Sequence, residues 1–233
     1  MFIPVYDQNP LRSIQFQAVT TGLILVNIVV FILQITTLSN QVILGFALVP
    51  NDLLGLGAAG QGRLLAPGNE IGIPERLTLI SYMFFHGDIL HLAGNMLFLW
   101  VFGDNVEDAL GHLKFLIFYL TCGVVGGLVH ALMMPSSEMP LIGASGAVAG
   151  VIAAYLMLHP RVRVWVLIFR FIPIQISAAF ALGAWIFTQF LMVLLPEVGP
   201  VAWWAHIGGI IAGAVLVTVM RRPGVPLFDR NIA

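Results

Sequence analysis

The chain has 233 residues, of which 59% are hydrophobic and only 9% are charged, whereas a soluble domain carries about 25% charged residues. This composition excludes a soluble globular protein and predicts a lipid bilayer as the surrounding medium. The 10 basic and 11 acidic residues almost cancel, so we expect no basic stripe for phosphates and no nucleic-acid partner. The single cysteine, Cys122, lies in an apolar run and is interpreted as a packing residue.

Six apolar stretches follow one another along the chain, and a membrane crossing needs about 20 residues. They cover about 16–35, 79–102, 114–133, 143–158, 176–195 and 202–220. We therefore expect an all-α fold, a bundle of six transmembrane helices that forms one domain over residues 1–233. The first stretch is expected to remain as an anchor, because no small-residue cleavage pattern follows it. Segment 164–172 is too short to cross and is expected at the membrane interface.

Basic residues predict the orientation, because cytoplasmic loops are enriched in Lys and Arg. With the N-terminus inside, the outer segments hold only Arg63 and Arg76. The cytoplasmic segments then hold Arg12, Lys114, Arg161, Arg163, Arg170, Arg221, Arg222 and Arg230. Both termini are expected to be cytoplasmic, in the inner (plasma) membrane of a prokaryotic cell. The outer loop, about 37–78, is long and partly apolar, and it is expected to lie on the membrane or to fill a cavity.

A first polar cluster leads into the second stretch with the sequence HGDILHLAGN, which starts at His86. Polar groups inside a membrane are costly enough to be treated as functional hypotheses. His91 and Asn95 are four residues apart, which places them one turn apart on the same helix face. Two hydrogen-bonding side chains can therefore point into one cavity.

A second cluster is Gly-Ala-Ser-Gly-Ala around Ser145, at the start of the fourth stretch. The first backbone N–H groups of a helix have no partner within it, and the helix dipole is positive there, which suits a developing oxyanion. Gly143 and Gly146 would let a substrate backbone approach closely. Read alone, the same small residues are more typical of close helix packing.

A third cluster lies in the last stretch, where His206, Gly209 and Gly213 share one helix face. The fourth stretch carries a matching stripe of small residues at Gly146, Ala149, Gly150 and Ala153. If the two stripes pack together, His206 can reach Ser145. Read alone, His206 is also explained as a histidine that is hydrogen-bonded for stability.

A serine at a helix start, a histidine within reach and two further donors are the parts of an acyl-transfer site. The predicted helices hold no acid near Ser145 or His206, so we expect a Ser–His dyad whose histidine is oriented by packing. A metal centre is the rival chemistry, with candidates His86, His91, His112, His130 and His206. We reject it because the spacing of the first two histidines puts them on different faces and no HExxH motif is present. No metal and no cofactor are expected.

The chain resembles the rhomboid intramembrane serine proteases in their basic six-helix bacterial form, over about residues 75–215. The resemblance rests on three ordered motifs, HxxxxHxxxN from His86, GASGA around Ser145 and AHxxGxxxG from His206. It implies that Ser145 is the nucleophile and His206 the general base. It also implies that His91 and Asn95 line an oxyanion hole with the Ser145 amide. Structural support is expected from His86, Glu107, Gly143, Gly146, Gly209 and Gly213.

Other segments are compared with the same family. Residues 103–111 resemble its loop after the second helix, where the glutamate at the Glu107 position is structural. Glu75 replaces a Trp that is usual at the end of the outer loop, and Ala149 replaces an aromatic that stacks on the histidine in some members. By analogy, the fifth helix is interpreted as a lateral gate from its aromatic residues Trp185, Phe187 and Phe190.

The resemblance implies cleavage of another protein's transmembrane segment near its outer end, so transmembrane protein substrates are the expected partners. The alternative is a non-proteolytic rhomboid-like protein that binds transmembrane clients, although such relatives typically lack the Ser or the His. A transporter or channel fits less well, because the spans hold no charged pathway and no internal repeat. The sequence leaves the oligomeric state open.

Overall fold

The computed structural model describes residues 3–56, 73–168, 171–195 and 201–229, and these residues are mostly helical. Among them, four helices are long and apolar enough to cross a membrane by length and composition. These are α1 (Ala18–Thr36), α5 (Ile89–Leu110), α6 (His112–Met133) and α9 (Trp203–Met220). Two shorter apolar helices, α7 (Ser145–Leu158) and α8 (Ala178–Leu194), lie at the predicted fourth and fifth stretches. The predicted helical bundle of membrane type is therefore present.

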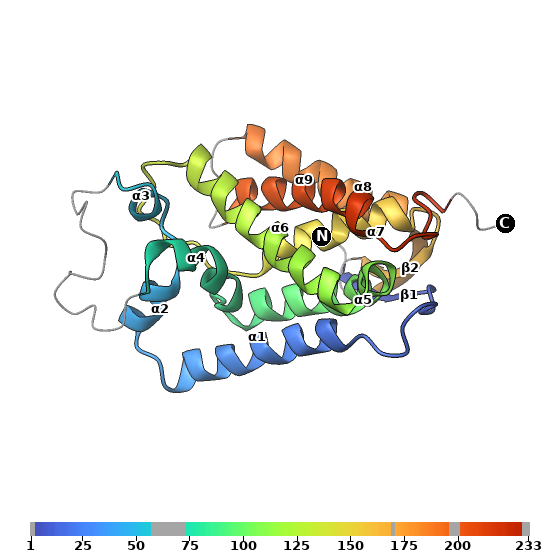
Figure 1. The fold of residues 1–233 in the computed structure, drawn as a ribbon, viewed down its shortest axis with the longest axis horizontal. Coiled ribbons are helices and arrows are strands. Elements are labelled where there is room, and N and C mark those ends of the chain that lie inside the picture. Colours follow the sequence, from blue (N-terminus) through green and yellow to red (C-terminus); the bar gives the residue numbers. More distant parts are fainter. Residues whose placement is uncertain (1–2, 57–72, 169–170, 196–200, 230–233) are drawn as a thin grey trace.

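The bundle has two different ends (Figure 1). At the left in this view lie α2 (Asn40–Phe46), α3 (Pro50–Leu53) and α4 (Glu75–Ser81), which define the α4 end of the molecule. At the right lie the strands and the C-terminal segment, which define the sheet end. Ser145 begins α7 at the α4 end, whereas the last residues of α5 and α7 lie at the sheet end.

A small antiparallel sheet was not predicted, and the all-α expectation is wrong for these segments. It consists of β1 (Ile3–Asp7), β2 (Arg163–Ile168) and β3 (Ile172–Ser177), in that order. Val164 and Val166 are buried while Trp165 between them is 38% exposed, which is the alternation of a strand. The alternation is hidden in the sequence because all three residues are apolar. Pairing with β1, more than 150 residues away, then supplies the backbone partners.

The second predicted stretch, 79–102, is also misplaced. It contains α4, a 3-10 turn at Tyr82–Phe84 and a break, before α5 begins at Ile89. Asp88 is the N-cap residue at which α5 starts anew after this break. Its carboxylate accepts hydrogen bonds from the backbone N–H groups of Leu90 and His91, both at 2.8 Å. The His91 N–H lowers the pKa of Asp88, so this side chain stays ionised at the start of the helix.

The expected loop at 103–111 is helical down to Leu110. The loop was expected from the family resemblance, but here Glu107 and Asp108 receive hydrogen bonds from other segments. Part of the predicted outer loop is folded as well, since Leu48 is fully buried and pairs with Leu141 in an isolated bridge. Residues 57–72 of that loop lie outside the described residues.

The core is built around α7, in which all but three residues are buried. Glycines let its neighbours approach to backbone contact: a Cβ atom at Gly209 or Gly213 would collide with the carbonyl oxygen of Gly146 or Gly150. Helix α6 also approaches α9 closely, because a Cβ at Gly126 of α6 would lie 2.7 Å from the carbonyl oxygen of Ala205. The small stripes on α7 and α9 therefore face each other, which fixes the relative position of the side chains at their ends.

Candidate active site

Ser145 and His206 meet where α7 and α9 touch. Ser145 is the first residue of α7, and its Oγ lies 2.9 Å from Nε2 of His206, in the first turn of α9. This distance is that of a good hydrogen bond between a hydroxyl and a ring nitrogen. The glycine contacts described above hold it in place, because any larger residue at Gly209 would push α9 away from α7.

The second nitrogen of His206 is held by Gln189, a residue that sequence reasoning missed. Nδ1 of His206 lies 2.8 Å from the side-chain oxygen of Gln189 on α8, and both side chains are buried. Packing is expected to orient His206, and the structure adds to it a hydrogen bond with Gln189 that the sequence analysis does not include. The signal was available, because Gln189 is the only Gln or Asn in the apolar run 178–194 and a polar group there is costly.

Aromatic rings from two elements also enclose His206. The ring of Trp185 on α8 lies 6.0 Å from the imidazole between centroids, and that of Trp203 lies 5.9 Å away at 90°. Ala149 is fully buried in a small cluster against which Trp185 packs. The aromatic missing at Ala149 is thus replaced by one that reaches the histidine from the neighbouring helix.

The turn before Ser145 is fixed by Tyr82. The backbone N–H of Gly143 donates to the carbonyl oxygen of Tyr82 at 2.9 Å, while the Tyr82 hydroxyl donates to the carbonyl of Gly123 on α6 at 2.8 Å. Gly143 has a φ of +129°, and a Cβ there would lie 2.7 Å from the His91 ring. Only glycine satisfies both conditions, so His91 lies directly against the backbone that leads into α7.

The remaining residues of the first motif lie around His91. Its ring packs edge-on against the ring of His86, with centroids 5.1 Å apart. The His86 backbone is held by Gln34 of α1, which donates to the His86 carbonyl at 2.6 Å and accepts from its N–H at 3.1 Å. Asn95 follows one turn after His91 and is buried, and its side-chain Nδ2 has no hydrogen-bond partner among the described residues.

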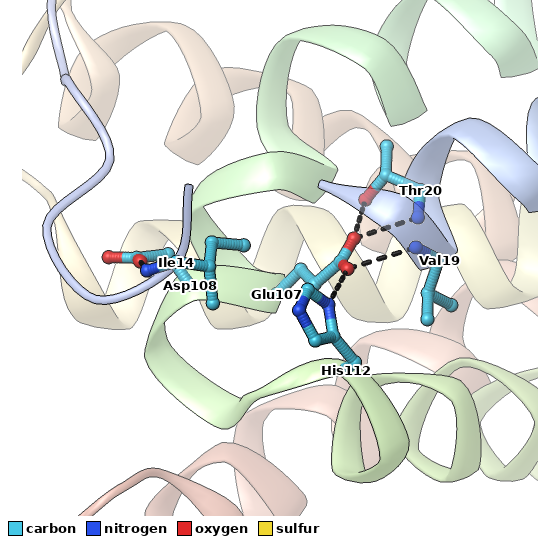
Figure 2. Close-up of polar contacts among 6 residues, drawn as sticks. All are labelled: Ile14, Val19, Thr20, Glu107, Asp108 and His112. Atoms are coloured by element: carbon cyan, nitrogen blue, oxygen red, sulfur yellow. Dashed lines mark hydrogen bonds and ion pairs between the residues drawn. The ribbon is translucent and has the colours of Figure 1, made fainter. Parts of the chain in front are cut away.

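Glu107 lies at the opposite, sheet end, and Figure 2 shows its contacts. Its carboxylate accepts from the backbone N–H groups of Val19 and Thr20 and from the Thr20 hydroxyl, at 2.7–2.9 Å. It also contacts Nδ1 of His112 at 2.5 Å. Glu107 thus satisfies the free donors at the start of α1 and takes no part in the Ser145 site. In the described part of the chain, no three metal-ligating side chains gather closely enough to hold an ion.

These features define a class of protein, a membrane-type helical bundle in which a partly buried serine at the start of a central helix contacts a buried histidine. A family model of the Rhomboid domain matches residues 74–223, which is more than half of the chain, and the chain belongs to that family. With its long apolar helices, it is therefore a membrane protein.

Curated relatives are similar over much of the chain. RHOMBOID-like protein 5 of Arabidopsis thaliana is 32% identical over 146 residues, which cover 63% of this chain and 44% of that protein. The Presenilin-associated rhomboid-like protein, mitochondrial, of Homo sapiens is 27% identical over 212 residues, which cover 87% of this chain and 48% of that protein. The matches therefore span less than half the length of these relatives.

Proposed function

We propose that this chain is an intramembrane serine endopeptidase that cleaves transmembrane segments of other membrane proteins near their outer end. The observation that carries the proposal is the 2.9 Å contact between Ser145 Oγ and His206 Nε2. In this mechanism Nε2 takes the hydroxyl proton as Oγ attacks the peptide carbonyl carbon. His206 then returns the proton to the leaving amine, and a water repeats the sequence to release the acyl group from Ser145.

The negative charge that develops on the carbonyl oxygen needs donors, and the proposed donors are three groups near Ser145. The Ser145 N–H belongs to the first turn of α7 and has no acceptor within the helix. His91 lies against Gly143, two residues before the serine. Asn95 offers a buried Nδ2 that lacks a partner. A buried donor without an acceptor costs about 1–3 kcal/mol, and this cost is understandable if the substrate oxygen is the acceptor.

We further propose that six helices cross the membrane, with α7 and α8 as the short fourth and fifth crossings. The basic residues support an orientation with the sheet end on the cytoplasmic side, because Arg12, Lys114 and Arg163 stand in or beside elements of that end. Ser145 is then near the outer surface, and the described parts of the first loop, 37–56 and 73–78, lie along it. The plasma membrane remains the proposed location, although several relatives carry the word mitochondrial in their names.

A fluorophosphonate probe tests whether Ser145 is activated, without any need for a substrate. We expect the purified protein in detergent or liposomes to be labelled, and Ser145→Ala to lose all labelling. His206→Ala should label at a much lower rate, because the hydroxyl then has no base. Absence of labelling in the wild type, in lipid as well as in detergent, would contradict the protease function and favour a protein that binds transmembrane clients without cutting them.

A further inference from the structure

We propose that Gln189 is a positioning residue that selects the tautomer of His206, so that the reaction requires α8 to be docked against α9. This inference rests on the protease function proposed above. Gln189 is a third side chain that acts through the base His206 and does not touch the substrate. The observation behind it is the 2.8 Å contact between Gln189 Oε1 and His206 Nδ1.

The orientation of the Gln189 amide follows from its other contacts. Its Nε2 lies 2.8 Å from the carbonyl oxygen of Trp185 and 3.0 Å from the hydroxyl oxygen of Thr188. A carbonyl oxygen can only accept, so the NH2 group must face Trp185 and the Oε1 atom must face His206. This assignment is independent of any assumption about the histidine.

The tautomer of His206 is then determined. Because Gln189 Oε1 is an acceptor, the neutral imidazole must carry its proton on Nδ1. Nε2 therefore presents its lone pair to the Ser145 hydroxyl, at 2.9 Å. The other tautomer would put a proton on Nε2 and could not accept the serine proton. A neutral amide thus does for this pair what a carboxylate does in a Ser-His-Asp triad, although it adds no negative charge.

The same bond ties the base to the position of α8. Four residues of α8 are buried, and three of them, Ala178, Ala181 and Leu182, lie in its first turns next to the sheet. Gln189 is the only buried residue in the half that approaches the Ser145 site, and Phe187, Phe190 and Leu194 on that half are exposed. Gln189 and the half-buried Trp185 therefore hold this half to the bundle. If this half of α8 moves outward, His206 loses the hydrogen-bond acceptor that sets its tautomer.

The test compares Gln189→Met, which keeps the size of the side chain but removes the acceptor, with Gln189→Glu, which keeps an acceptor. Gln175→Met, on β3 at the sheet end, is the matched control. Two quantities are measured in detergent or liposomes: kcat and KM for cleavage of a transmembrane substrate as a function of pH, and the ¹⁵N shifts of the His206 ring, assigned with His206→Ala.

We expect Gln189→Met to lower kcat about 10- to 100-fold with little change in KM, and to lose the uniform Nδ1–H signature. Gln189→Glu should restore most of kcat and move the acid limb of the pH profile to higher pH, because a carboxylate stabilises the imidazolium. Gln175→Met should behave as wild type. Thermal unfolding of each variant separates these effects from loss of the fold.

The two proposals can fail separately. If the wild type cleaves and Gln189→Met has the same kcat, pH profile and ring shifts, the positioning role is wrong and the protease function stands. If Gln189→Met and Gln189→Glu are equally slow with unchanged pH profiles, Gln189 serves packing and the positioning role is again overturned. If the wild type itself neither cleaves nor labels, the protease function falls and the role of Gln189 falls with it.

Discussion

The two ends of the bundle both contain buried polar side chains, but they differ in what these side chains contact. At the sheet end, the carboxylates of Glu107 and Asp108 each accept several hydrogen bonds from the backbone of the N-terminal segment. At the α4 end, the Nδ2 of Asn95 has no hydrogen-bond partner among the described residues, and at the sheet end the Oδ1 of Asn105 has none either. Neither burial nor an unpaired polar atom alone therefore identifies a site in this fold.

Position is informative together with hydrogen bonding: Asn105 hydrogen-bonds the segment after β1, whereas Asn95 lies one turn after His91, which packs against Gly143 next to the serine. A fully bonded carboxylate has no lone pair left for chemistry and stabilises the chain that it holds. A buried donor without an acceptor destabilises the free protein, and is understandable where a substrate later fills the gap. On this reasoning, substitutions at the α4 end should change catalysis more than stability, and substitutions at the sheet end should do the opposite.

Among substitutions that keep Ser145 and His206, the largest effect is expected where the glycine contact sets the Ser–His distance. In Gly209→Ala, the new Cβ collides with the carbonyl oxygen of Gly146, so α9 must shift. A displacement of about 1 Å costs on the order of 100-fold or more in rate, and the overpacking costs about 1–3 kcal/mol. The fluorophosphonate labelling rate and the unfolding midpoint measure the two effects.

The control for this substitution is Gly22→Ala in α1, where a Cβ meets nothing within 4 Å. It should retain the full labelling rate and gain slightly in stability, since alanine favours a helix more than glycine does. If Gly209→Ala labelled as fast as Gly22→Ala, close α7–α9 packing would not be what sets the Ser145 geometry.

The next effect is expected at Asn95. Removal of one oxyanion donor in Asn95→Ala should lower kcat about 100-fold, while KM changes little and the unfolding midpoint does not fall, because Nδ2 has no partner among the described residues to lose. Cleavage kinetics on several transmembrane substrates check this. Full kcat on all of them would show that Asn95 does not act on the transition state.

The smallest effect on catalysis is expected at the sheet end. Glu107→Gln keeps the shape but replaces an ionised acceptor that holds Val19, Thr20 and His112. Loss of these charge-assisted bonds should destabilise the protein by about 1–3 kcal/mol, with kcat per folded molecule unchanged. Thermal unfolding and kcat measured well below the midpoint separate the two. A large loss of kcat at full folding would mean that the two ends are coupled.

The sequence allowed much of this architecture to be predicted, for physical reasons. Long apolar runs specify membrane helices, and the glycine stripes of α7 and α9 specify a close contact, so the approach of Ser145 to His206 could be anticipated. The sheet could not, because β1 is brought to β2 only by the tertiary fold. The predicted second stretch began about ten residues before α5, because the capping side chain Asp88 starts a new helix inside a mostly apolar segment.

The orientation of His206 was missed for a different reason. This orientation depends on Gln189, which is 17 residues away in sequence. Gln189 belongs to the fifth helix, whose aromatic residues were the expected functional feature. The spacing of residues along one helix predicts which of them share a face. It does not predict which side chain of a third helix will reach a given ring nitrogen.

The proposal that Ser145 and His206 cleave transmembrane segments is tested most directly by cleavage of a transmembrane substrate by purified protein in liposomes. Ser145→Ala and His206→Ala are measured beside the wild type. We expect that only the wild type cuts, near the outer end of the substrate helix. Both variants should keep the wild-type unfolding midpoint and bind the substrate, because each loses one member of a catalytic unit. Cleavage by Ser145→Ala at the wild-type rate, or substrate binding without cleavage by all three proteins, would contradict the proposal.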